Sequence, residues 1–359
     1  MWHKVCHKFP DSKGNEMDWR KIGAAAAASL AFLILGAQPA AAQPPAAPAS
    51  YDGLKVVMCG TSGPLPVHDR AKACVAIQAG GSLYLVDVGP ESVENLMTWR
   101  MPLATAKAVF LTHLHSDHLG DLGEFNMQSW VAGRPAPLAL VGPPGTDKVA
   151  AGFNMAYGPD HGFRNAHHAH GVVTMPIAAG LLKAQVVPPP ASGTAVVWSQ
   201  DGLTVTAITV HHNPVTPAYA YRFDYKGRSV VVSGDTIKWP PLAAAAKGAD
   251  VLLHEAQNAD MTRQLASALQ MMGNARMSSV MTDTLTYHTT PVEAAEIARM
   301  AGVKRLVLYH LTQAGLPMFN PEAFTKGMDA GGPLDWRISK DGMTIELPAN
   351  GTDIRFGQF

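Results

Sequence analysis

The sequence lacks an excess of either charge, since 28 Lys and Arg residues balance 28 Asp and Glu residues in a chain of 359. Surfaces that bind nucleic acid usually carry a basic excess, so we do not expect a nucleic-acid partner. Internal repeats with the period of a solenoid or propeller are not visible either. The length exceeds that of a small domain but fits one large globular domain.

A long apolar run is also missing from the N-terminal region. The run Ile22–Gly36 follows Arg20 and Lys21 and precedes the small residues Ala37–Ala42, and it is shorter than the roughly 20 residues of a membrane-spanning helix. A basic start, an apolar core and a small-residue exit are typical of a secretory signal. We expect a signal peptide over 1–42, with Met17 as an alternative true start, and a Pro/Ala-rich leader over 43–50. An uncleaved anchor is the alternative.

Cleavage after Ala42 would place the mature chain in the periplasm or outside the cell, with no membrane span. It would remove five basic and three acidic residues, so the mature chain is slightly acidic. Of three cysteines, only Cys59 and Cys74 remain, in strand-like runs separated by a turn. An oxidising compartment favours a disulfide, but two buried thiols fit the sequence equally well.

Short strand-like runs occur in two groups, which suggests two packed sheets covered by helices in an α/β protein. Helical patterns lie at about 91–101, 121–131 and 291–301. In the last, Thr290 and Glu293 form a capping box, Pro291 suits the first position and Gly302 can end the helix. The strand-like runs are 54–58, 74–77, 83–88, 108–112 and 137–141, then 203–210, 219–223, 229–233, 250–254 and 305–309.

An irregular insertion is expected at about 150–194, which is rich in Gly, His and Pro. Long irregular segments in compact domains are usually functional loops or disordered. We interpret its densest part, 160–170, as a loop beside the substrate, with Arg164 as an anion contact and His167 and His168 near it. The alternative is a His-rich surface loop that contacts nothing.

The densest group of metal-binding side chains is His113-Leu-His115-Ser-Asp117-His118, directly after an apolar strand. Residues i and i+2 of an extended segment point the same way, so His113 and His115 can bind one ion. Asp117 and His118 on the following turn can bind a second. Other apolar strands end at His211-His212, at Asp235 and at His310, which aims further ligands at one point.

These motifs, with the Cys59-Gly-Thr-Ser-Gly-Pro turn, Ser233-Gly-Asp235-Thr236 and His288-Thr-Thr, resemble the metallo-β-lactamase superfamily. The resemblance covers about 54–315 and is strongest to ribonuclease Z-like and arylsulfatase-like members. It implies a four-layer αββα sandwich, with 51–359 as a single metallo-hydrolase domain.

The resemblance also implies the roles of individual residues. His113, His115 and His212 would bind the first ion, Asp117, His118 and His310 the second, and Asp235 would bridge both. His212 fits the family spacing better than His211, although the reverse assignment stays open. Asp117 would orient a metal-bridging hydroxide, and His288 would protonate the leaving group. The His254-Glu255 pair would lie close behind the site.

Nitrogen and oxygen ligands with a bridging carboxylate suit two divalent ions, first of all Zn²⁺, with Mn²⁺ or iron as alternatives. Because the chain looks exported and slightly acidic, we expect a small ester as substrate, either a sulfate ester or a phosphodiester. A lactone, a β-lactam, or RNA in the manner of ribonuclease Z, which processes precursor transfer RNA, are the alternatives. A non-catalytic metal-binding periplasmic protein is a more distant one, and a homodimer is left open.

Overall fold

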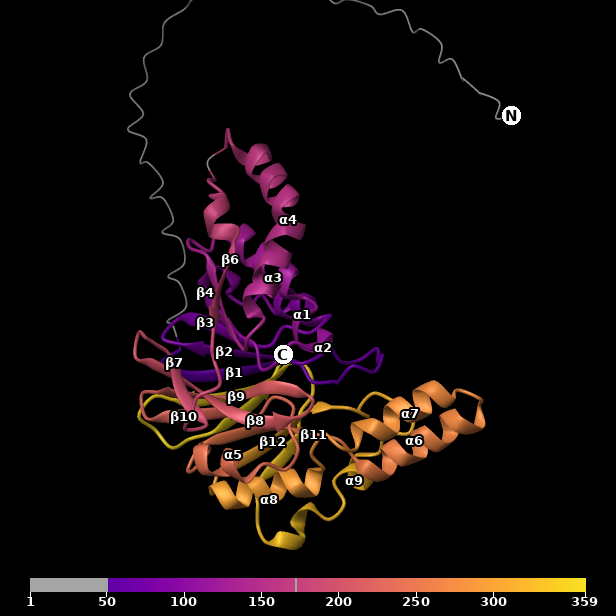
Figure 1. Cartoon of the computed structure of the whole chain (residues 1–359). Coiled ribbons are helices and arrows are strands. Elements are labelled where there is room, and N and C mark those ends of the chain that lie inside the picture. Colours follow the sequence, from indigo (N-terminus) through magenta and orange to yellow (C-terminus); the bar gives the residue numbers. More distant parts are fainter. Residues whose placement is uncertain (1–50, 172) are drawn as a thin grey trace, which may run out of the picture. The chain divides into compact units, whose positions relative to one another are not determined.

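Two β-sheets form the centre of the fold in the computed structural model, which describes residues 51–171 and 173–359 (Figure 1). The expected signal peptide and leader lie outside the described residues. The first sheet has the order β15-β14-β1-β2-β3-β4-β5-β6 and the second β13-β12-β11-β10-β9-β8-β7. Within the described ranges, no helix is long and apolar enough to cross a membrane.

Each sheet is antiparallel on one side and parallel on the other. In the first sheet β1, β2 and β3 pair antiparallel, and β3 to β6 pair parallel. The second sheet repeats this, with antiparallel β8, β9 and β10 followed by parallel β10, β11, β12 and β13. The two strand-rich groups of the sequence therefore correspond to the two sheets. The strands of the first sheet are β1 Gly53–Gly60, β2 Cys74–Ala79, β3 Ser82–Val86, β4 Ala106–Phe110, β5 Leu138–Gly142, β6 Leu182–Val186, β14 Met343–Pro348 and β15 Arg355–Gln358. Those of the second are β7 Thr194–Gln200, β8 Leu203–His212, β9 Val215–Tyr225, β10 Arg228–Val232, β11 Val251–Ala256, β12 Arg305–Leu311 and β13 Trp336–Ile338.

Three apolar layers separate the sheets from each other and from the helices. The inner layer joins side chains of both sheets, such as Phe110 from β4 and Phe223 from β9, whose rings meet edge to face at 5.4 Å. A second layer lies between the first sheet and α1 and α3, and a third between the second sheet and α5 and α8. These layers confirm the predicted αββα sandwich. The helices are α1 Ser92–Thr98, α2 Ser116–Leu119, α3 Leu122–Val131, α4 Thr146–His168, α5 Pro240–Ala245, α6 Ala259–Met271, α7 Ala275–Thr284, α8 Pro291–Ala301 and α9 Pro321–Phe324, with short 3₁₀ turns η1 Leu103–Thr105, η2 Ile177–Gly180 and η3 Met328–Gly331.

The prediction of an irregular insertion over 150–194 is wrong. Helix α4 occupies 146–168 and extends away from both sheets (Figure 1), and η2 and β6 follow it. Three glycines and Pro159 lie inside α4, which is why its sequence shows little helical periodicity. Packing supports the helix instead: the buried His161 lies edge-on against Trp130 of α3, with ring centroids 4.9 Å apart.

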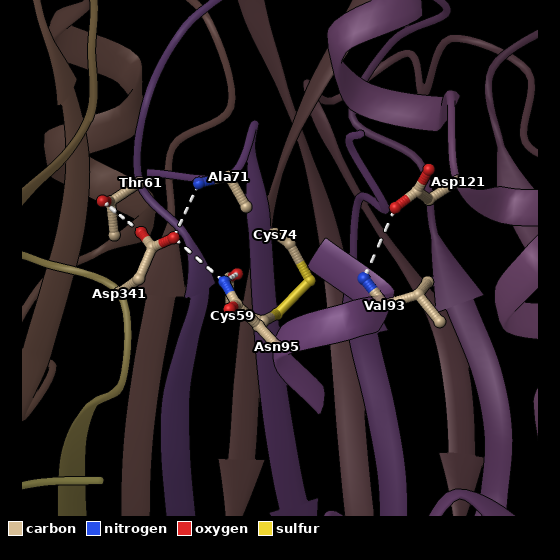
Figure 2. Close-up of a disulfide and its surroundings, with 8 residues drawn as sticks. All are labelled: Cys59, Thr61, Ala71, Cys74, Val93, Asn95, Asp121 and Asp341. Atoms are coloured by element: carbon tan, nitrogen blue, oxygen red, sulfur yellow. Dashed lines mark hydrogen bonds between the residues drawn. A yellow bond between two sulfur atoms is a disulfide. The ribbon is translucent and has the colours of Figure 1, made fainter. Parts of the chain in front are cut away.

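Of the two states considered for the cysteines, the structure has the disulfide. Cys59 and Cys74 lie on the neighbouring strands β1 and β2, with Cα atoms 5.0 Å apart, and both are buried. The Asn95 side chain donates to the Cys59 carbonyl oxygen (2.9 Å) and to Asp341 (3.0 Å), as Figure 2 shows. The disulfide joins the end of β1 to the start of β2. The segment that follows β1 pairs with β12 through Ser62 and Leu311.

Candidate metal centre

The His113–His118 segment leaves β4 at the end of the first sheet and turns into the short helix α2. The rings of His113 and His115 lie on the same side, with Nε2 of the first 2.9 Å from Nδ1 of the second. Asp117 and His118 are buried in α2. The extended backbone and the turn therefore place two pairs of ligands side by side, as the spacing predicts.

Strand ends of the second sheet bring the remaining ligands to the same place. His212 ends β8, and Asp235 follows β10 after a turn at Gly234. Glycine is required in that turn because φ is +60° and a Cβ atom would lie 2.6 Å from the Tyr219 carbonyl oxygen. His310 in β12 has a φ of 47°, which non-glycine residues rarely adopt, at a register shift between β11 and β12.

The seven predicted ligands form two adjoining groups. Within each group, one potential ligand atom per residue lies within 4.8 Å of all the others. Oδ2 of Asp235 lies 3.9 Å from Nε2 of His212 and 3.5 Å from Nε2 of His118. Its carboxylate therefore contacts both groups, which is the geometry expected of a bridging ligand. The groups are His113, His115, His212 and Asp235, and Asp117, His118 and His310; a third group, Asp235, His288 and His310, overlaps both the ligands and the predicted proton donor.

The buried charges and nitrogens of this cluster fit two divalent ions. Oδ1 of Asp235 is buried and has no hydrogen-bond partner among the described residues. Burial raises the pKa of Asp235, but His310 and His118 outweigh it and hold the pKa well below its usual range. Burial lowers the pKa of His113 well below its usual value, which leaves the neutral form that binds metal. A buried, ionised carboxylate with one oxygen atom lacking a hydrogen-bond partner, surrounded by imidazole nitrogens, fits a bound cation.

Residues behind the ligands fix their orientation. Asp87, after β3, accepts from Nδ1 of His118 at 2.8 Å and from both the backbone N–H and the hydroxyl of Thr112. The Tyr287 carbonyl oxygen accepts from Nδ1 of His212 at 2.9 Å. Such contacts orient ligand rings and raise their basicity. Our sequence reasoning missed Asp87, although it follows an apolar strand just as Asp235 does.

His288 and Glu255 form a second polar pair at the edge of the ligand groups. Oε1 of the fully buried Glu255 accepts from Nδ1 of His288 (3.0 Å) and from the backbone N–H groups of Thr236 and Thr289. Burial lowers the pKa of His288, but Glu255 and then Asp235 outweigh it and raise the pKa to about 9. Glu255 therefore favours the protonated form of His288. Its Nδ1 lies 4.0 Å from Oδ2 of Asp235.

The structure does not bring the predicted substrate residues to the ligand groups. Arg164, His167 and His168 lie on the distal part of α4, which extends away from the sheets (Figure 1). Arg164 instead pairs with Asp160 one helical turn earlier, at 2.9 Å. His211 is also outside the groups, with its ring 5.4 Å from that of Trp239.

Tyr287 lies directly against the centre, although our sequence reasoning gave it no role. Its ring centroid is 5.3 Å from that of His212 and 4.9 Å from that of His288. Burial raises the pKa of Tyr287, and the negative charges of Asp283, Asp235 and Asp117 raise it further. The phenol is therefore within electrostatic reach of the carboxylates of the centre.

Comparison with known proteins places this geometry in a family. Residues 83–311 match the model of the "Beta-lactamase superfamily domain". A protein named Ribonuclease Z from Mycobacterium bovis (strain BCG / Pasteur 1173P2) is 36% identical over 264 residues, which cover 73% of this chain and 87% of that protein. One of the same name from Mycobacterium tuberculosis (strain H37Rv) is 35% identical, covering 73% and 86%.

Solved structures share the fold. A metallo-beta-lactamase fold protein from Bacillus subtilis aligns with a TM-score of 0.58 and 22% identity, over 82% of this chain and 100% of the other. The short form of human tRNase Z aligns with a TM-score of 0.58 and 20% identity, over 82% and 99%. With its ribonuclease Z-like relatives and its histidine and aspartate cluster, the chain belongs to the metallo-β-lactamase superfamily and is a metal-dependent hydrolase of ester bonds.

Proposed function

We propose that this hydrolase cleaves phosphodiester bonds, with RNA as its first candidate substrate. The observation that carries the proposal is the Glu255–His288 pair beside two adjoining ligand groups. A charged proton donor next to a two-ion site suits a reaction in which an alkoxide departs from phosphorus. The extensive match to proteins named Ribonuclease Z supports RNA over a small ester.

We assign the proton transfers to two residues of this chain. Nδ1 of His288 donates to Glu255, so Nε2 is the nitrogen that gives its proton to the departing oxygen. Oδ2 of Asp117 lies 3.2 Å from Nε2 of His310, which leaves Oδ1 to accept a proton from the attacking water. Glu255 favours the protonated form of His288, as an acid requires.

The seven ligand residues would hold two divalent ions, for which we propose Zn²⁺, with Mn²⁺ or iron as alternatives. Such ions polarise the scissile group and lower the pKa of a bound water. The fit rests on the ionised Asp235 carboxylate, whose buried Oδ1 has no hydrogen-bond partner among the described residues, and on the neutral imidazole of His113.

RNA as substrate reverses the expectation drawn from net charge. A balanced total says nothing about a local surface, and relatives that match over most of their length are named for a ribonuclease. The small-ester alternative retains one observation in its favour. The Cys59–Cys74 disulfide suits an oxidising compartment, and the expectation of a small ester was drawn from export to such a compartment.

A substrate panel separates these candidates. The full chain, loaded with Zn²⁺ or Mn²⁺, would be assayed on a precursor transfer RNA, on bis(para-nitrophenyl) phosphate and on para-nitrophenyl sulfate. We expect turnover of both phosphodiesters, little turnover of the sulfate, and none of any substrate by Asp235→Asn. Turnover of the sulfate alone would overturn the proposal, and turnover of bis(para-nitrophenyl) phosphate without cleavage of the RNA would favour a small ester over RNA.

We also propose that the chain is exported, because of the basic, apolar and small-residue order over 20–42. Fractionation of expressing cells, followed by N-terminal sequencing, tests this proposal. We expect a periplasmic or secreted protein that begins at Gln43. An uncut chain that stays with the cytosol would refute export without affecting the proposed chemistry.

A further inference from the structure

The Tyr287 ring packs against both the predicted proton donor His288 and the predicted metal ligand His212, whose own rings are 5.3 Å apart. Tyr287 directly precedes His288, and its ring is tilted by 51° to that of His288 and by 85° to that of His212. The Tyr287 side chain is only partly buried, so part of the ring is open to solvent beside the centre. The edge of the site next to the leaving group is therefore aromatic.

Other tyrosines near the centre have clear structural roles, which Tyr287 lacks. Tyr219 and Tyr221 are fully buried, and their hydroxyls donate to the carbonyl oxygens of Val187 and Leu111. The fully buried Tyr309 hydroxyl accepts from the Gly234 N–H. The Tyr287 hydroxyl makes no hydrogen bond to another described residue, and its ring belongs to none of the apolar clusters of the described chain.

The backbone of Tyr287 does have a structural role, and it can be separated from the side chain. Its carbonyl oxygen accepts from Nδ1 of His212, and its N–H bonds to the Thr284 carbonyl oxygen at the end of α7. A side-chain substitution leaves both groups in place. The function of the ring can therefore be tested without removing the support of His212.

We propose that Tyr287 is a specificity-determining residue that stacks on a planar ring in the leaving group of the substrate. The departing oxygen must come within hydrogen-bond reach of His288, so the group attached to that oxygen passes next to Tyr287. A partly buried aromatic ring at that position favours a planar partner, either an aryl group or a nucleobase. The inference rests on the proposed function, since His288 defines the leaving-group side.

Paired substrates test the ring directly. Methyl para-nitrophenyl phosphate has an aromatic leaving group, and methyl trifluoroethyl phosphate has none. A uridine dinucleotide and its counterpart with an abasic leaving residue form the nucleobase pair. The variants are Tyr287→Leu, Tyr287→Phe and, as a matched control, Thr286→Ala at an exposed neighbouring position.

We expect Tyr287→Leu to lower kcat/KM on the ring-bearing member of at least one pair by about tenfold more than on its ring-free partner, the scale of a stacking contact. Tyr287→Phe should stay within about twofold of the wild type, and metal content should not change in any variant. The pair that responds identifies an aryl group or a nucleobase as the partner. Equal losses on ring-bearing and ring-free substrates, or an equal loss in Tyr287→Phe, would overturn the proposal.

A binding measurement keeps this test independent of turnover. If the wild type hydrolyses no phosphodiester, the proposed function fails, but titration calorimetry of the metal-loaded protein still compares phenyl phosphate, uridine monophosphate and ethyl phosphate. Stronger binding of a ring-bearing ligand that disappears in Tyr287→Leu supports the stacking role. Identical affinities of wild type and Tyr287→Leu for all three ligands would overturn it.

Discussion

At the residue scale, two adjacent histidines at the end of β8 have opposite surroundings. His212 is buried within the first ligand group, whereas the His211 side chain lies next to Trp239 and is partly exposed. We expect His212→Ala to abolish turnover and to lower metal content, because it removes a ligand. His211→Ala serves as the matched control and should retain most activity. Loss of activity in His211→Ala alone would show that the assignment is shifted by one residue.

Glu255 should control the pH range in which His288 acts. The His288 pKa is raised to about 9, and Glu255 is the strongest of the groups that raise it. Activity that depends on protonated His288 is present below that pKa and is lost as the pH rises through it. Glu255→Gln removes the negative charge and lowers the His288 pKa, so the alkaline limb of kcat/KM should move to lower pH.

The readout for Glu255 is a pH–rate profile on bis(para-nitrophenyl) phosphate. His288→Ala should lack the alkaline limb altogether and should lose about 10²–10⁴-fold in rate, the usual contribution of a general acid. An unchanged profile in Glu255→Gln would mean that another group titrates there.

The predicted ligands could be read from the sequence because each follows an apolar strand or lies in one dense motif. Asp87 also follows an apolar strand, but no local signal links it to the ligands, and Tyr287 follows no apolar strand. Asp87 is more than twenty-five residues from His118 in sequence, and the contact between them exists only after β3 and β4 pair. Tyr287 supports His212 through a backbone carbonyl, which no side-chain pattern reveals.

At the element scale, α8 and α4 show which helices a sequence can predict. The bounds of α8 are those expected, because its capping box at Thr290 and its left-handed end at Gly302 are local signals. Helix α4 depends instead on distant contacts. The Asn154 side chain donates to the Leu182 carbonyl oxygen in β6, and the His161 ring packs against Trp130 of α3. The glycines and Pro159 within α4 are unfavourable in helices, so the sequence did not predict this helix.

The position of α4 restricts what its exposed polar residues can contact. Arg164 belongs to none of the ligand groups and lies on α4, which extends away from the sheets (Figure 1), so we do not expect it to contact the reacting atoms of a small ester. Arg164→Ala should therefore change kcat/KM on bis(para-nitrophenyl) phosphate by less than about twofold, well under the tenfold that about 1.4 kcal/mol represents. A decrease of tenfold or more in kcat/KM on this small substrate would instead support the prediction that Arg164 contacts the substrate.

At the scale of the whole molecule, the sequence was sufficient to predict two packed sheets with helices outside. The two groups of apolar runs predict the two sheets. The ligands predict how the sheets meet, since they lie at or just after the ends of strands in both sheets. The disulfide was left open because only the pairing of β1 with β2 brings the two thiols together. The total charge was a weak guide to the substrate, because it does not describe any one surface.

The metal content of the purified full chain tests the central claim most directly. Elemental analysis of a metal-replete preparation should give about two divalent ions per chain, as in other two-metal hydrolases. Asp235→Ala should lose both ions, because its carboxylate contacts both groups, whereas Asp117→Ala should mainly weaken the second. Well under one ion per chain in the wild type, or equal retention in the two variants, would contradict a dinuclear centre bridged by Asp235.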